Sequence, residues 1–76
     1  MDMSGIVLKD ETGVIVDVSR DEKIGWVRND RDRSKAFLHV SDFPNAPGGV
    51  LPKGERVVYD AIFPPKGAKA TNVRMI

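Results

Sequence analysis

The most informative segment for the fold is KIGWVRNDRDRSKAFLHV, residues 23–40, in which two short apolar runs flank a charged turn. Successive side chains of an extended strand point to opposite faces. Ile24 and Trp26 therefore share one face of the first run, and Phe37 and His39 share one face of the second. If the two runs pair as strands, these four side chains form one cluster.

The rest of the chain shows the same short period. Apolar β-branched residues recur with a period of two, and no window repeats them at helical spacing. Prolines, glycines and charged clusters separate the apolar runs, as in turns. One helical turn is expected at about 41–43. The sequence predicts an all-β chain whose strands lie at about 12–19, 24–29, 35–40, 55–63 and 69–75, which suits a small barrel.

A chain of 76 residues has room for one domain. We expect the barrel to occupy residues 12–76. Residues 1–11 are expected to form an N-terminal extension, either a tail or an added edge strand, and the sequence leaves both open. No cysteine is present, which excludes disulfides and fits a reducing compartment, so a cytoplasmic location is expected. No export signal and no apolar run of about 20 residues is visible, so no membrane span is expected.

The net charge of +1 does not by itself indicate a nucleic-acid-binding protein. The distribution of charge is more informative. Residues 20–39 hold six basic residues against four acidic ones, and residues 53–76 hold five against two. The middle and the end of the chain are therefore its basic parts.

Three segments together resemble the cold-shock domain family, namely KIGWV at 23–27, AFLHV at 36–40 and KGAKATNV at 66–73. The resemblance extends over residues 13–72. It implies a five-stranded antiparallel β-barrel of the OB-fold type. It also implies that single-stranded RNA or DNA is the partner and that a monomer binds it.

A second family has a similar barrel, the RNA-binding repeat named after the largest small-subunit ribosomal protein. Residues 13–18 and 37–41 would suit that repeat. Its last strand usually ends in a segment rich in serine and leucine, whereas residues 66–73 look like the cold-shock ending. Both families imply binding of single-stranded nucleic acid.

The predicted cluster is expected to face solvent, because the opposite face of the same strands supplies Val27, Ala36 and Leu38 to the core. Exposed aromatic patches usually mark an interaction surface, and aromatic faces stack with any base. Nearby basic side chains would contact phosphates. The predicted nucleic-acid-binding residues are Lys23, Ile24, Trp26, Arg28, Lys35, Phe37, His39, Val40 and Lys66. Phe43 and Tyr59 are assigned to packing, and Phe63 either caps the barrel or extends the binding face.

The first strand departs from the family pattern. Val16, Asp17 and Val18 stand where a typical member displays a lysine and two adjacent aromatic residues. Ile24 and Val40 also replace phenylalanines. The stacking platform is thus reduced to its centre, which leaves an alternative function open, a protein-interaction or decoy module with weak nucleic-acid binding.

Catalysis finds little support in the sequence. One histidine and no cysteine leave few candidates for nucleophilic or acid-base roles. The run from Asp30 to Asp32 lacks the glycine and glutamate of a calcium loop and is interpreted as a turn. We therefore expect no enzyme activity, no cofactor and no metal site.

Overall fold

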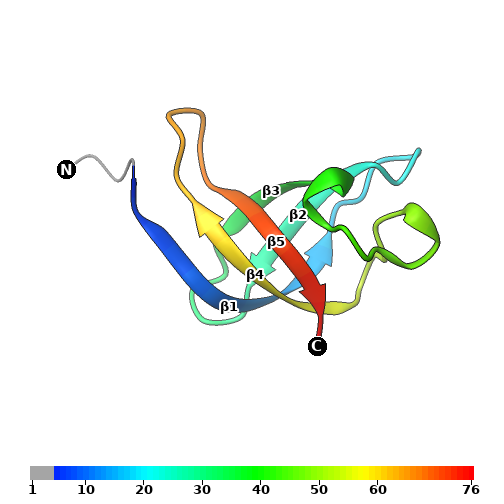
Figure 1. Cartoon of the computed structure of the whole chain (residues 1–76), viewed down its shortest axis with the longest axis horizontal. Coiled ribbons are helices and arrows are strands. Elements are labelled where there is room, and N and C mark those ends of the chain that lie inside the picture. The colour runs from blue at the N-terminus through cyan, green and yellow to red at the C-terminus, as the bar shows by residue number, and fades with distance from the viewer. Residues whose placement is uncertain (1–4) are drawn as a thin grey trace.

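The computed structural model describes residues 5–76 as five strands and two single-turn 3₁₀ helices (Figure 1). The strands are β1 (Val7–Val16), β2 (Ile24–Asn29), β3 (Lys35–His39), β4 (Arg56–Ile62) and β5 (Lys69–Met75), and the 3₁₀ helices are η1 (Val40–Asp42) and η2 (Pro47–Gly49). The helical turn expected near residue 41 is present as η1. In this part of the chain no helix has the length and apolarity that a membrane crossing requires.

The strands close into a barrel in the order β1-β2-β3-β5-β4. All neighbours are antiparallel except β3 and β5, which run parallel through one bridge, Phe37 to Lys69. A closed ring with an odd number of strands cannot alternate direction throughout, so one parallel pair is required. The prediction of a five-stranded all-β barrel is confirmed, and the expectation that every pair is antiparallel is wrong at this one place.

The first strand begins at Val7, earlier than the predicted start near residue 12. Its first half pairs with β4, with Val7 opposite Ile62, and the register shifts between Leu8 and Glu11. The predicted extension at 1–11 includes residues 1–4, which lie outside the described residues. The division of the chain into an extension and a barrel stays a prediction.

The core lies inside the barrel and is formed by inward-facing side chains of all five strands, together with Phe43 and Leu51 from the segment between β3 and β4. Alternation along β2 and β3 buries Val27, Ala36 and Leu38, as predicted. Phe43 and Tyr59 are each 2% exposed, which confirms their assignment to packing. The buried apolar residues are Ile15, Val27, Ala36, Leu38, Phe43, Leu51, Val57, Tyr59, Ala61, Ala70 and Val73.

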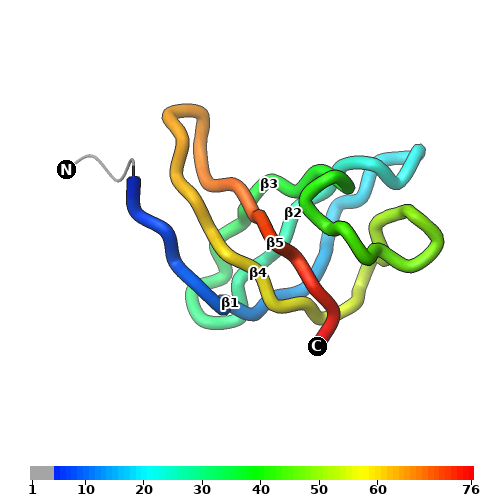
Figure 2. Tube along the Cα trace, viewed as in Figure 1, coloured from blue at the N-terminus to red at the C-terminus, as the bar shows by residue number. Residues whose placement is uncertain are grey.

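A long loop carries η2 and joins η1 to β4 on one side of the barrel (Figure 2). Leu51 anchors this loop, because its side chain is 1% exposed and its N–H donates to the carbonyl of Glu22 at 2.9 Å. The N–H of Gly54 donates to the carbonyl of Ile15 at 2.8 Å. The loop is therefore fixed beside the start of β2.

Candidate binding face

The aromatic side chains of β2 and β3 lie side by side on the outside of the barrel. Trp26 stands opposite Phe37, and Ile24 stands opposite His39. Trp26 is 39% exposed and Ile24 is 41% exposed, although large apolar side chains are usually buried. The predicted cluster and its outward orientation are confirmed, and we call these four residues the aromatic face.

The two rings of the aromatic face contact each other edge to face. The centroids of Trp26 and Phe37 are 5.5 Å apart and the ring planes are inclined by 80°. This geometry is favourable for an aromatic pair. Because one ring turns only its edge toward the other, the pair leaves aromatic surface that the partner ring does not cover. A flat ligand could stack on that surface.

His39 is oriented by the 3₁₀ helix that follows it. Its Nδ1 accepts a hydrogen bond from the backbone N–H of Ser41 at 3.0 Å and lies 2.8 Å from the Ser41 hydroxyl oxygen. The imidazole therefore caps η1 through one nitrogen. The rest of the ring is exposed beside Ile24, where it extends the aromatic face.

A hollow of about 540 Å³ separates the two rings from the loop between β4 and β5. The N–H of Phe37 donates to the carbonyl of Ala68 at 2.9 Å, which fixes the end of that loop beside the aromatic face. Hollows of this size accommodate small organic groups. The residues that line this hollow are Trp26, Lys35, Phe37, Pro64, Lys66, Gly67, Ala68 and Lys69.

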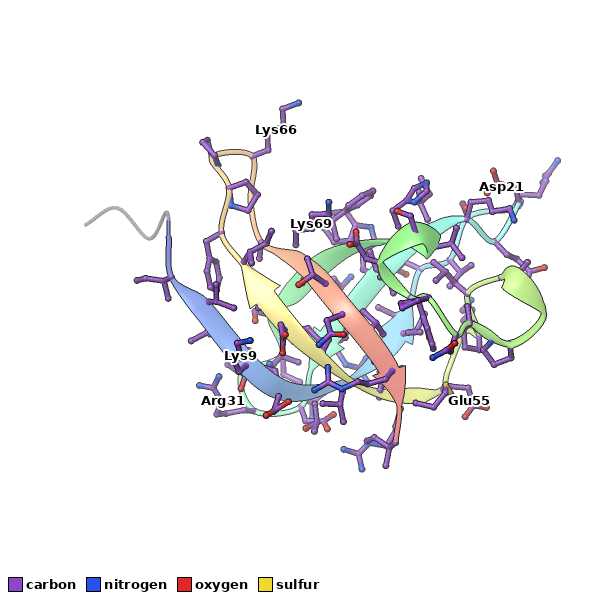
Figure 3. All side chains as sticks on the ribbon, viewed as in Figure 1. Lys9, Asp21, Arg31, Glu55, Lys66 and Lys69 are labelled. Atoms are coloured by element: carbon purple, nitrogen blue, oxygen red, sulfur yellow. The ribbon has the colours of Figure 1, made fainter. Side chains whose placement is uncertain are left out.

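Two of the three lysines around this hollow are paired with acidic side chains. Lys35 Nζ lies 2.8 Å from a carboxylate oxygen of Asp17, and Lys69 Nζ lies 3.4 Å from one of Asp42. The hydrogen bond from Lys35 lowers the pKa of Asp17 below its ordinary value. Lys66 stands at the tip of the β4–β5 loop and extends away from the barrel (Figure 3).

The other predicted residues differ in how they lie relative to the aromatic face. Arg28 lies next to Lys35 in the β2–β3 register and is half-buried. Lys23 is directed toward the long loop, where Nζ donates to the carbonyl of Gly49 at 3.3 Å. Val40 is half-buried and packs against the core, so its side chain does not join the aromatic face.

The sequence interpretation missed the contribution of the β4–β5 loop and the start of β5. Pro64, Ala68 and Lys69 line the hollow but were not among the predicted site residues. Lys69 lies opposite Phe37 only because β3 and β5 pair in parallel. The family resemblance of residues 66–73 was the available signal for this segment, since no local pattern predicts that pairing.

A second hollow of about 300 Å³ is lined in part by a polar network. The Nδ2 group of Asn29 donates to the Tyr59 hydroxyl at 2.9 Å and to a Glu11 carboxylate oxygen at 3.2 Å. Burial raises the pKa of Tyr59. Phe63 lines this hollow and packs against the core, and it does not line the hollow beside Trp26. Of the two alternatives for Phe63, the structure favours the cap.

Acidic side chains do not gather into a metal site in the described chain. Within residues 5–76 no group of three His, Cys, Asp or Glu side chains is suited to hold a metal ion. Asp32 instead accepts from the N–H of Ser34 at 2.9 Å, and Asp30 forms an ion pair with Arg56. The interpretation of this segment as a turn is confirmed.

Comparison with known proteins gives one informative similarity. No model of a protein family matches the chain. A cold shock-like protein of Aquifex aeolicus is 28% identical over 64 residues, which span 84% of this chain and 91% of that protein. The aligned region includes most of the barrel, and the match supports a distant homology.

Proposed function

We propose that this chain, a distant homologue of a cold shock-like protein, binds single-stranded RNA or DNA by stacking unpaired bases on its aromatic face. The observation that carries the proposal is the outward-facing pair of exposed Trp26 and half-buried Phe37 beside a hollow of about 540 Å³. Burying these rings would have been favourable, since apolar area removed from water stabilises the fold by about 25 cal/mol per Å². Their exposure therefore favours a role in binding.

The residues around the rings would contribute in two ways, by stacking and by charge. Ile24 and His39 extend the stacking surface along the same two strands. Lys23, Arg28 and Lys66 supply positive charge for the phosphates, which position a strand without reading its sequence. We infer a monomeric cytoplasmic protein without catalytic activity that acts on RNA as a chaperone or on gene expression as a regulator.

Removing one ring tests the proposal most simply. Phe37→Ala should weaken binding of a fluorescently labelled uridine-rich RNA by about 1 to 3 kcal/mol, because one stacking platform is lost. Its thermal unfolding, followed by circular dichroism, should stay close to that of the parent, since Phe37 is only half-buried. Fluorescence anisotropy measures the affinity.

Val7→Ala is the control, because Val7 is an apolar side chain on the surface, 46% exposed, that does not line the hollow. This variant should bind RNA as the parent does. Equal affinity of Phe37→Ala and the parent would remove the aromatic face from the proposed site.

A protein-interaction or decoy module is the second candidate function. One observation favours it, the pairing of Lys35 and Lys69 with acidic side chains, which reduces the attraction for phosphates. Under this alternative, heptathymidine and uridine-rich RNA would bind the parent protein only weakly at every salt concentration tested.

A further inference from the structure

Two of the lysines that line the hollow lie on strands, and each forms an ion pair with an acidic side chain of the same chain. Lys35 of β3 contacts Asp17, and Lys69 of β5 contacts Asp42. The four side chains are between 24% and 58% exposed, so a ligand could reach each pair. A phosphate that approaches either lysine would find a carboxylate already beside it.

Asp17 is placed at this rim by the end of the first strand. β1 ends at Val16, which lies opposite Trp26, and Asp17 then adopts a left-handed backbone with φ of 52°. This turn brings the carboxylate to Lys35, one of the residues that line the hollow.

Displacement of the carboxylate by a phosphate exchanges one anion for another at the same lysine. The net electrostatic gain of that exchange is small, because the ammonium group is already paired in the free protein. Stacking of a base on Trp26 or Phe37 does not require a carboxylate to be displaced, because the two rings contact each other only edge to face.

We propose that Asp17 and Asp42 are specificity-determining residues, which neutralise Lys35 and Lys69 so that the face selects ligands by their unpaired bases and gains little from their phosphates. The inference rests on the proposed function and adds the kind of ligand preferred, a single strand with accessible bases over a densely charged polyanion.

The test is a salt titration of heptathymidine binding with charge-neutralised variants. Asp17→Asn should tighten binding about two- to fivefold at low salt, because it frees one ammonium group for a phosphate. The slope of log affinity against log salt should become steeper by about 0.7 for that one new contact. Asp42→Asn should act in the same direction through Lys69.

Asp10→Asn is the matched control, since Asp10 also has a left-handed backbone, φ of 56°, and pairs with Arg74 away from the hollow. Asparagine tolerates that conformation well, so both Asp17→Asn and Asp10→Asn should fold. Asp10→Asn should change the total charge equally but leave the slope as in the parent. An equal effect of the two variants would show that only net charge matters and would overturn the inference.

A double-mutant cycle then identifies Lys35 as the group that is released. Combined with Asp17→Asn, Lys35→Gln should cancel both the gain in affinity and the steeper slope, because the ammonium group that Asp17→Asn frees is then absent. A double variant that keeps the gain in affinity would overturn the inference and leave the proposed function standing. Absence of heptathymidine binding in every protein would overturn both.

Discussion

Asp60 lies on the outward face of β4. It is nevertheless buried, with only 6% of its surface exposed. Its carboxylate accepts from the N–H of Asp10 at 3.0 Å and from Asn72 Nδ2 at 3.3 Å. Both partners have left-handed backbones, with φ of 56° and 50°. Asp60 therefore stabilises the places where β1 and β5 depart from regular pairing with β4.

The hydrogen bond from Asp10 lowers the pKa of Asp60 below its ordinary value. A carboxyl whose pKa is lower in the folded state stabilises the fold fully above its unfolded pKa of about 3.9. That stabilisation is lost as the pH falls through the folded-state value. We expect the urea midpoint of the parent to decrease in this acidic range.

Asp60→Ala should lower the free energy of unfolding at pH 7 by about 1 to 3 kcal/mol, because it removes the acceptor of two part-buried hydrogen bonds. The difference between variant and parent should shrink as the pH falls below about 4. Urea unfolding at several pH values measures it. Glu55→Ala removes an exposed acid and serves as the control. A constant difference across the pH range would contradict this role for Asp60.

At the scale of elements, the sequence predicted β2 and β3 to within one residue, because their alternation of inward and outward side chains is regular. For the first half of β1 the sequence left two alternatives open, a tail or an added edge strand. Lys9, Asp10 and Glu11 interrupt its apolar pattern, and the irregular register is held by Asp60, fifty residues from Asp10. Such a contact is set by tertiary structure and has no local signature.

Close packing of β1 against β2 gives a prediction for Gly13. A Cβ atom at this position would lie 2.5 Å from the carbonyl oxygen of Arg28 and 2.8 Å from Val27 Cγ1, so the two strands would have to separate. Gly13→Ala should destabilise the fold by about 1 to 3 kcal/mol, as overpacking usually does.

Gly25→Ala is the comparison, because its Cβ would approach neighbours no closer than 3.3 Å. Its loss of stability, measured by urea unfolding at neutral pH, should be the smaller of the two. The reverse order would show that β1 and β2 are spaced differently from the structure described.

For the whole molecule, the basic segments seen in the sequence are partly compensated by acids that lie far from their partners along the chain. Besides the two pairs of the hollow, Arg31 pairs with Glu11 and Arg56 with Asp30. The partners are 20 and 26 residues apart along the chain. The distribution of charge along the sequence therefore overstated the positive potential available to a ligand.

In the candidate site, too, some features follow from the local sequence pattern and others depend on contacts between distant segments. Trp26 and Phe37 were predictable, because strand alternation alone puts them on the face opposite the core. The hollow beside them was not, because it forms where β3 meets β5 and where the β4–β5 loop folds over. The ion pair at Asp17 likewise depends on a turn conformation that the sequence did not indicate.

If bases stack on Trp26, the emission of this single tryptophan should report the contact. The protein should be titrated with heptathymidine and with an abasic deoxyribose-phosphate strand of equal length, while anisotropy of labelled strands reports saturation. Heptathymidine should quench or shift the emission saturably, whereas the abasic strand should leave it nearly unchanged. An unaltered emission at saturating heptathymidine would contradict stacking on the aromatic face.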